Sequence, residues 1–472
     1  MKINWSKLEF SRANCYYIVM NNNLKKITLL AGDIGVLYLS LYFTLLIRYS
    51  RQPSDQLWGD HLIPFTIIFL VWIMTFYISN LYDLRLAINN NKFLQTTGRA
   101  LLISMLLSFG FFYLTPQITI APKTNLFIYI FVFSLLFILW RRVFNWLLGS
   151  YLPKAKIAII GYNEQVKELV EEFALRPHFG YQVQLIISEE EIQLNDKNIL
   201  ISKFFDNLKN YIIEQKIDTV VLTTDPHYSD ELRNVLFDCL PLKINFVGLP
   251  KFYEAITGKV PIEVISKMWF FENLNEGNKK WFDIFKRFYD LLLALIILII
   301  TFPFWLIIFL IIKIDSRGPV FFLSPRKGKN DQVFNLIKFR TMRVNDNNFA
   351  PTASNDPRIT AFGKFLRKTR LDEIPQMINI IRGELSFVGP RPERPELIKD
   401  LEEKIPFYRE RMLVKPGATG WDQVSGEYHS PSIEDTLKKL QYDLFYVKNR
   451  SIYLDITIVL KTIRTIITSG GI

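Results

Sequence analysis

The chain of 472 residues carries 57 Lys and Arg against 45 Asp and Glu, a net charge of +12, and half of its residues are hydrophobic. This hydrophobicity excludes a disordered chain, and its two cysteines exclude a disulfide scaffold. The length predicts about three domains. An excess of positive charge in so apolar a chain points either to nucleic acid or to a membrane and anionic substrates.

Four long apolar runs in residues 1–150 predict four transmembrane helices. The runs are Ile27–Ile47, Leu62–Tyr82, Ala100–Ile120 and Leu126–Trp140. Crossing a hydrocarbon core takes about 20 helical residues, and the first three runs reach that length. The fourth run is shorter, but Thr124 and Asn125 before it can extend it. Four buried soluble helices are the alternative, but the amphipathic period they would show is missing over whole segments. Asp33 lies inside the first run, and we expect it to pair with Lys26 rather than to act as a functional intramembrane acid.

Basic residues near the ends of these runs predict their orientation, because cytoplasmic loops carry the excess of Lys and Arg. The larger clusters lie before the first run, between the second and third, and after the fourth. They are Lys2, Lys7, Arg12, Lys25 and Lys26; Arg85, Lys92 and Arg99; and Arg141, Arg142, Lys154 and Lys156. We therefore expect the N-terminus and everything after the fourth helix to be cytoplasmic.

Residues 151–270 predict a soluble α/β domain with a Rossmann-like sheet, because short apolar runs alternate with a helical pattern. The candidate strands are Lys156–Ile160, Val183–Ile187, Thr219–Leu222 and Ile244–Val247, and the candidate helix is Val166–Leu175. A dinucleotide-binding turn needs three glycines. Only Gly161 is present, with Asn163 and Val166 in the other two places. We favour a degenerate nucleotide fold with a structural or regulatory role, and cofactor binding is the alternative.

A polar stretch at 271–280 predicts a linker, and the apolar run Leu291–Ile312 that follows is long enough to span a membrane. Basic residues flank this run on both sides. A spanning helix would therefore leave one basic cluster outside the cell, against the positive-inside tendency. Pro303 lies within the run and interrupts the ladder of helical hydrogen bonds. We infer a re-entrant helix that dips into the bilayer and returns to the cytoplasmic face; a plain fifth span is the alternative.

Residues 281–472 hold the candidate chemistry in three clusters of charged residues. The clusters are Lys338–Met342, Leu366–Gln376 and Val388–Glu393. Arginine binds phosphate oxygens through two parallel hydrogen bonds. A carboxylate can hold Mg²⁺ together with substrate phosphates, or attack phosphorus as a nucleophile. Asp372 and Glu373 are adjacent, so on a helix they point about 100° apart and can take different roles. The alternative for each cluster is a solvated charged surface.

These motifs, in this order, resemble the bacterial sugar transferase family of monotopic polyprenol-phosphate phosphoglycosyl transferases. The resemblance covers residues 279–472 and rests on Lys286-Arg287 with Asp290, Gly318-Pro319-Val320-Phe321-Phe322, Lys338–Met342, Leu371–Gln376, Gly389–Pro392, Lys415–Trp421 and Tyr442-Asp443-Leu444 with Tyr446. The whole chain resembles the large members that start exopolysaccharide, capsule or O-antigen repeat units. It departs from the family at Ser324-Pro325, because a Gln usually stands two residues before the arginine that is Arg326 here.

The resemblance implies transfer of a sugar-1-phosphate from a UDP-sugar to undecaprenyl phosphate, with release of UMP. It implies that Asp372 is the nucleophile on the β-phosphate and that Glu373 helps to bind Mg²⁺. It also implies that four basic residues lie at or near the substrate phosphates, namely Arg367 and Arg391, with Lys338 and Arg340 as supports. For the two supports, salt bridges to local acids are the alternative.

Together these expectations describe a membrane protein with a four-helix transmembrane N-terminal bundle, an α/β Rossmann-like middle domain and a mixed α/β monotopic catalytic domain with a re-entrant helix. The implied location is the bacterial inner membrane, with the catalytic domain on the cytoplasmic face. The expected partners are the donor, the acceptor and the lipid bilayer; a homo-oligomer is left open, and nothing calls for nucleic acid. The alternatives are a non-catalytic membrane scaffold or nucleotide sensor of polysaccharide assembly, and a glycosyl transferase that releases UDP.

Overall fold

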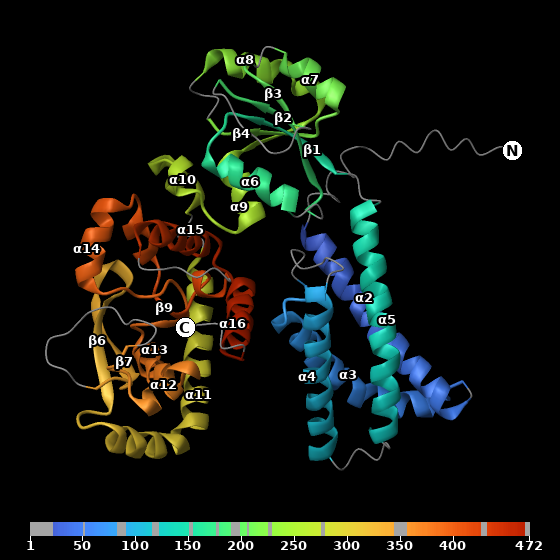
Figure 1. The fold of residues 1–472 in the computed structure, drawn as a ribbon, viewed down its shortest axis with the longest axis vertical. Helices are drawn as coiled ribbons and strands as arrows, with labels where there is room; N and C mark the ends of the chain where they lie inside the picture. The colour runs from blue at the N-terminus through green and yellow to red at the C-terminus, as the bar shows by residue number, and fades with distance from the viewer. Residues whose placement is uncertain are drawn as a thin grey trace. The chain divides into compact units, whose positions relative to one another are not determined.

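The structure is a computed structural model. It describes residues 22–50, 52–82, 91–115, 122–150, 154–175, 179–189, 199–204, 207–224, 229–274, 279–343, 356–425 and 432–467. The chain forms two compact units that divide between Phe252 and Tyr253, and Figure 1 follows it from the N-terminus in blue to the C-terminus in red. The basic residues at 2, 7, 12 and 85 that predict the orientation lie outside the described residues.

The first unit contains long apolar helices, as the four runs predict. They are α2 (Asn22–Tyr49), α3 (Asp55–Ile78), α4 (Asn91–Leu114) and α5 (Pro122–Ser150). Each is long and apolar enough to cross a membrane. Their shared core is rich in aromatic rings, which stack or meet edge to face: Phe65, Phe69, Trp72, Phe76, Tyr129, Phe133 and Phe137. The chain is therefore a membrane protein.

Helix α3 begins and ends earlier than the predicted run Leu62–Tyr82. Ser54 caps its N-terminus, and the Ser54 Oγ accepts a hydrogen bond from the Leu57 amide at 3.2 Å. At the other end Asn80 adopts a left-handed φ of 59°, which a continuing helix cannot accommodate. Polar capping residues, rather than the limits of the apolar run, thus decide where this helix starts and stops.

Asp33 does not have the predicted partner. Its carboxylate pairs with Arg141 at 2.6 Å and accepts a hydrogen bond from the Trp140 indole at 3.1 Å, and both members of the ion pair are buried. Arg141 also donates to the Leu81 carbonyl at 2.7 Å. Gly32 allows the approach, because a Cβ there would lie 1.9 Å from the Trp140 ring. The expected pairing with Lys26 is wrong because α5 packs against α2 at this point and supplies a nearer, buried cation.

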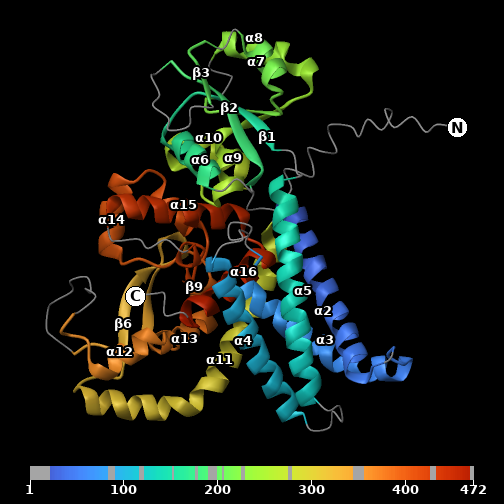
Figure 2. The same cartoon turned by 45° about the vertical axis from the view of Figure 1, so that its right-hand side comes forward.

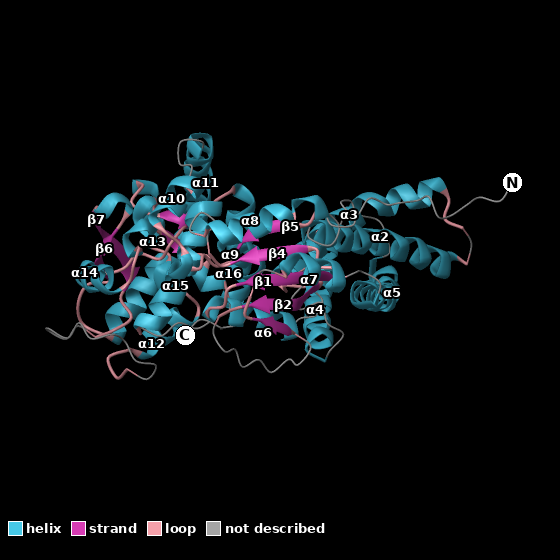
Figure 3. Ribbon diagram, turned by 90° about the horizontal axis from the view of Figure 1, so that it is seen from above, coloured by secondary structure: helices cyan, strands magenta, loops and turns pink. Residues whose placement is uncertain are grey.

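The first unit also contains a five-stranded parallel sheet with the strand order β3-β2-β1-β4-β5, and Figure 3 shows β1, β2, β4 and β5 side by side. The strands are β1 (Ala155–Ile160), β2 (Tyr181–Ile187), β3 (Leu200–Ser202), β4 (Thr219–Leu222) and β5 (Asn245–Gly248), and the helices are α6 (Glu164–Leu175), α7 (Leu208–Gln215) and α8 (Asp230–Asp238). The apolar runs predict every strand except β3. This edge strand is only three residues long, too short for a run of apolar residues to mark it as a strand.

The second unit is a mixed α/β body. Its strands are β6 (Phe321–Lys327) and β7 (Val333–Phe339), which form an antiparallel hairpin, and β8 (Ser386–Val388) and β9 (Gly417–Thr419), which pair in parallel. Its helices are α10 (Lys267–Asn273), α11 (Lys280–Asp315), α12 (Ala361–Lys368), α13 (Gln376–Arg382), α14 (Pro395–Lys404), α15 (Ile433–Asn449) and α16 (Ile452–Ile467), and α9 (Leu249–Thr257) crosses the division. In the segment 271–280, α10 ends at Asn273 and α11 begins at Lys280.

Helix α11 contains the fifth apolar run and has Pro303 inside it. Figure 2 shows that the helix bends into two arms, as expected where a proline removes a backbone donor and crowds the preceding turn. The first arm packs Ala294 against Phe334 and Ile380. The second packs Ile308 and Ile312 into another cluster of the same unit. Both arms therefore lie on one α/β body, while most of their other apolar side chains are exposed.

Candidate active site

The Asp-Glu pair lies in a tight turn between two short helices. The turn η9 (Leu371–Glu373) follows α12 and precedes α13, and Arg370 opens it with a left-handed φ of 56°. Non-glycine residues adopt this conformation rarely, and such residues gather at functional sites. Asp372 is 7% exposed, and its Oδ1 has no hydrogen-bond partner among the residues that the structure describes. The turn thus holds a buried carboxylate oxygen that the surrounding side chains leave unsatisfied.

Glu373, in contrast, is held by cations. Its Oε1 accepts from Lys338 Nζ at 2.7 Å and from Arg391 Nη2 at 2.8 Å, and Arg370 lies 3.9 Å away. Lys338 comes from the end of β7 and Arg391 from the loop after β8. The structure therefore brings together predicted site residues from three separate segments of the chain, and their charges converge on one carboxylate.

The two neighbouring acids have opposite pKa shifts. Burial, and then the negative charge of Glu373, raise the pKa of Asp372 to about 6. Burial acts in the same direction on Glu373, but Arg391 and Lys338 outweigh it and hold the pKa of Glu373 well below its usual range. The pKa of Lys338 is lowered, chiefly by burial. One acid is thus firmly ionised while the other is a buried, poorly stabilised anion, a contrast that often separates catalytic roles.

Close contact between two backbones holds the Arg391 loop. Gly389 and Gly417 donate to the carbonyls of Thr419 and Pro390, each at 2.9 Å. A Cβ on Gly389 would lie 2.4 Å from the Lys415 carbonyl oxygen, so any side chain there would push the two segments apart. The two glycine-containing motifs of the sequence therefore shape this loop and set the starting point of the Arg391 side chain.

The two remaining predicted arginines lie differently. Arg367 donates from Nε to Thr341 Oγ1 at 2.9 Å, and its charge acts on Asp372, so it belongs to the same site. Arg340 does not join the Glu373 cluster. Its guanidinium donates to the carbonyls of Ser316 at 2.6 Å and Ile312 at 3.4 Å, so it binds the C-terminal end of α11. These contacts are to carbonyl oxygens rather than to the local acids that we named as the alternative.

Sequence reasoning missed two buried charges behind the site. Arg411, in the short helix η10 (Tyr408–Leu413), pairs with Asp443 of α15 at 2.6 Å and donates to the Arg391 carbonyl at 2.8 Å. Arg411 lies in a polar stretch with no recognisable motif. Asp443 stands in one of the motifs that carry the family resemblance, but a motif alone assigns it no partner.

Comparison with known proteins identifies the family. The family model described as bacterial sugar transferase matches residues 281–469. The chain is 33% identical to a UDP-N-acetylgalactosamine-undecaprenyl-phosphate N-acetylgalactosaminephosphotransferase of Aeromonas hydrophila, over 64% of this chain and 68% of that protein. It is 29% identical to a UDP-glucose:undecaprenyl-phosphate glucose-1-phosphate transferase of Klebsiella pneumoniae, over 92% and 93% of the two chains. A protein with the same name from Escherichia coli K12 is 40% identical over 38% of this chain and 39% of its own.

The mixed α/β body, with its Asp-Glu turn and convergent cations, defines a membrane-bound transferase. The chain belongs to the bacterial sugar transferase family and is a phosphoglycosyl transferase. The resemblance inferred from the sequence motifs is thereby confirmed.

Proposed function

We propose that this protein transfers a sugar-1-phosphate from a UDP-sugar to undecaprenyl phosphate and releases UMP, with Asp372 as a covalent nucleophile. The observation that carries the proposal is the state of Asp372, a buried carboxylate whose Oδ1 accepts no hydrogen bond from the described residues. A buried polar atom without a hydrogen bond calls for an explanation, and this one lies in the turn where Lys338 and Arg391 converge on Glu373. The relatives from Aeromonas hydrophila and Klebsiella pneumoniae are named for UDP-sugars and undecaprenyl phosphate, which supports the same substrate classes here.

The reaction has two displacements at one phosphorus. In the first, a carboxylate oxygen of Asp372 forms a bond to the sugar-bearing phosphorus, and the bond from that phosphorus to the bridging oxygen breaks. UMP leaves with the bridging oxygen and its electron pair. In the second, a phosphate oxygen of undecaprenyl phosphate attacks the same phosphorus, the acyl–phosphate bond breaks, and the carboxylate is restored. Arg391 and Lys338 offset the negative charge that develops on the diphosphate.

Mg²⁺ fits the site through Glu373. A metal-binding carboxylate must be ionised, and the lowered pKa of Glu373 meets this condition. Lys338 and Arg391 both contact the same oxygen, Oε1, so we assign the second carboxylate oxygen to the metal. The described residues contain no group of three or more His, Cys, Asp or Glu that could hold a metal alone. Mg²⁺ commonly binds one or two carboxylates together with substrate phosphates, whose charge it neutralises.

Helix α11 supports a re-entrant arrangement on the cytoplasmic face. Near its start, Arg287 donates to the carbonyls of Ile380 and Ile381 at 2.5 and 2.7 Å. Near its end, Asp315 accepts from the Phe362 amide at 3.1 Å. Both flanks of the apolar run are therefore tied to one globular body, although a straight helix would separate its ends by about 1.5 Å per residue. Cysteines introduced near residues 280 and 320 should both be labelled only from the cytoplasmic side. Labelling of either position from outside would indicate that α11 spans the membrane as a fifth transmembrane helix.

An apolar cavity next to the catalytic turn suits the isoprenoid chain of the acceptor. The cavity has a volume of about 250 Å³ and lies between the second arm of α11 and α12. All of its lining residues are uncharged, and they include Phe304, Ile307, Ile308, Phe362, Leu371 and Ile374. Leu371 and Ile374 flank the Asp-Glu pair in sequence, so a chain in this cavity would bring its phosphate to the nucleophile. Apolar burial in such a cavity would hold the acceptor without any polar contact to its tail.

We infer that the parallel sheet is a degenerate nucleotide fold. Its strand order is that of the doubly wound folds that bind dinucleotides at the first strand-to-helix turn. In this chain Asn163 Oδ1 already accepts from the Val166 amide at 2.9 Å, and Glu164 begins α6. Gly161 is packed so closely that a Cβ would lie 1.8 Å from Thr223 Oγ1. A capped and negatively charged helix N-terminus opposes phosphate binding, so we assign this domain a structural or regulatory role.

The released nucleotide distinguishes the proposed reaction from its alternatives. Purified protein in lipid nanodiscs should release UMP from at least one member of a UDP-sugar panel when undecaprenyl phosphate is present. Release of UDP would indicate a glycosyl transferase that leaves the phosphate behind. No nucleotide release from any donor would favour a non-catalytic scaffold. The relatives are named for different sugars, so their names do not indicate the donor sugar of this protein. The same panel would identify it, because only a UDP-sugar that is a substrate yields UMP.

A further inference from the structure

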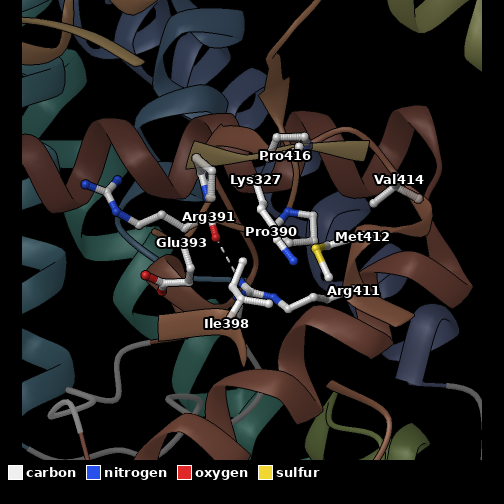
Figure 4. Close-up of a pocket in the computed structure, with 11 residues that line it drawn as sticks. Lys327, Pro390, Arg391, Glu393, Ile398, Arg411, Met412, Val414 and Pro416 are labelled. Atoms are coloured by element: carbon white, nitrogen blue, oxygen red, sulfur yellow. Dashed lines mark hydrogen bonds between the residues drawn. The ribbon is translucent and has the colours of Figure 1, made fainter. Parts of the chain in front are cut away.

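A buried ion pair lies directly behind the loop that carries Arg391. Arg411 and Asp443 meet at 2.6 Å, and their side chains are only 4% and 2% exposed. Arg411 also donates to the Tyr408 hydroxyl and to the Arg391 carbonyl, each at 2.8 Å. Figure 4 shows this last bond as a dashed line beneath the loop. One guanidinium thus joins an acid on α15 to the backbone of a residue in the active site.

Arg391 is therefore contacted at both of its ends. Its guanidinium donates to Glu373, and its carbonyl accepts from Arg411. Figure 4 shows a small pocket whose lining includes Lys327, Arg391 and Arg411; the Arg391 side chain points away from this pocket, while its carbonyl oxygen faces Arg411. Because the backbone of Arg391 is the fixed point from which its side chain reaches Glu373, a shift of that carbonyl would carry the guanidinium with it.

We propose that the Arg411–Asp443 pair is a positioning device, which holds the backbone of Arg391 so that its guanidinium meets Glu373 and the donor diphosphate. The inference deepens the proposed function and rests on it. Neither residue touches the reacting atoms; both act through Arg391. Misplacement of a phosphate-binding group by about 1 Å can cost roughly 100-fold in rate, so such a device has a catalytic purpose.

Neighbouring contacts show that the whole loop is fastened from behind. Arg326 of β6 donates to the Pro392 carbonyl at 3.1 Å, and the Lys327 amide donates to the Glu393 carbonyl at 3.0 Å. Three successive carbonyls, from Arg391 to Glu393, are thus hydrogen-bonded to η10 or β6. The departure from the family at Ser324-Pro325 lies in β6, and it leaves the Arg326 contact with this loop in place.

The burial of the pair argues for a geometric role rather than a stabilising one. Removing two charges from water costs about as much as their attraction returns, so buried pairs add little net stability. Burial also raises the pKa of Asp443 to about 6, against the opposing effect of Arg411. The pair instead fixes the orientation of the Arg411 guanidinium, because this planar group can contact Asp443, Tyr408 and the Arg391 carbonyl in only one orientation.

The test removes both charges together. Breaking a buried pair from one side leaves a stranded charge, whereas replacing both partners by apolar residues is often neutral for stability. The double variant Arg411→Met/Asp443→Leu should therefore fold with a thermal midpoint close to wild type. Its kcat for UMP release should fall by roughly 100-fold, with a smaller change in KM for the UDP-sugar. A second variant, Arg411→Lys, keeps the charge but loses the fork, and it should lose at least roughly 10-fold in kcat.

A mutant cycle with Arg391 separates positioning from general damage. If the pair acts through Arg391, the triple variant, which adds Arg391→Ala to the double variant, should have the same kcat as Arg391→Ala alone. If the changes act independently, the fold reduction in kcat of the triple variant should be the product of the two separate reductions. A control is Arg450→Met/Asp283→Leu, which removes another ion pair of the same unit, of 2.7 Å and with Asp283 partly exposed, and should leave kcat unchanged.

The outcomes distinguish this inference from the proposed function. If the wild-type protein releases no UMP from any UDP-sugar, the proposed function fails. If the wild type is active, two results would each overturn the positioning role and leave the proposed reaction intact. One is a double variant with the kcat of the wild type. The other is a triple variant with Arg391→Ala in which the separate reductions in kcat multiply. If the double variant does not fold, Arg411→Lys decides: wild-type kcat overturns the inference, and a folded variant with reduced kcat and unchanged KM upholds it.

Discussion

Replacing Asp372 by Asn should abolish UMP release and at the same time make the fold more stable. Burial and the neighbouring Glu373 raise the pKa of Asp372 from 3.8 to about 6. At pH 7 the carboxylate is ionised in both the folded and the unfolded chain, so the folded state bears an anion that its surroundings disfavour. The difference between 3.8 and about 6 corresponds to ~3 kcal/mol. Asn has nearly the same shape and no charge, so it should recover part of this free energy.

The gain in stability of Asp372→Asn over the wild type should increase with pH. The folded state prefers the protonated acid, so the penalty on the wild type develops as pH rises from 3.8 through about 6 and is complete above that value. Thermal unfolding of purified protein in nanodiscs should therefore give a midpoint several degrees higher for Asp372→Asn than for wild type at pH 7.5. The two midpoints should approach each other as pH falls below about 4, where Asp372 is protonated in the folded chain and increasingly protonated in the unfolded chain as well.

A matched control is Asp331→Asn. Burial alone would raise the pKa of Asp331, but its contacts with Arg409 and Lys327 hold that pKa below its usual value. Removing this charge should therefore leave the midpoint unchanged or lower it, with UMP release intact. A lower midpoint for Asp372→Asn at pH 7.5 would refute the argument from burial and the unpartnered oxygen. Turnover of Asp372→Asn at near the wild-type rate would refute the nucleophile assignment.

Three further outcomes follow from the same site. The rate of UMP release at low donor concentration should rise with pH and level off above about pH 6, because only the ionised Asp372 is a nucleophile; a flat profile between pH 5 and 7 would contradict this. Chelation with EDTA should stop UMP release and added Mg²⁺ should restore it, and full activity in EDTA would remove the metal role of Glu373. Ile307→Trp should fill the apolar cavity and raise KM for undecaprenyl phosphate by roughly 10-fold, while exchange of labelled UMP into the UDP-sugar is unchanged. The control for this last change is Leu306→Trp, on an exposed position outside the cavity lining, and an equal effect of both variants would exclude the cavity as the acceptor site.

Local patterns in the sequence were enough to predict the long apolar helices, four of the five parallel strands and the family. A helix that crosses lipid must satisfy its backbone internally and present an apolar surface, so a continuous apolar run marks it. Buried parallel strands are apolar on both faces, which is why β1, β2 and β4 were visible. The edge strand β5 has no buried residue but still lies in a mostly apolar four-residue run, whereas the edge strand β3 has only three residues. The Asp-Glu pair and its surrounding motifs are contiguous, so they could be read without any structure.

The partners of the buried charges could not be read in this way. Asp33 was expected to pair with Lys26, one turn or two away, but it pairs with Arg141 from another helix. Arg340 was expected to support the substrate phosphates, yet it binds carbonyls at the end of α11. A charge pairs with whatever packing brings within a few ångströms, and sequence separation carries little information about that distance.

The sequence by itself determined what kinds of residue this protein uses and in which order it uses them. Only the tertiary structure decided that Lys338 and Arg391 converge on one oxygen of Glu373, and that Arg411 reaches the Arg391 backbone from behind. The physical reason is the range of the forces involved. Periodicity and capping act between neighbours along the chain, whereas hydrogen bonds and ion pairs depend on how separate elements pack against one another.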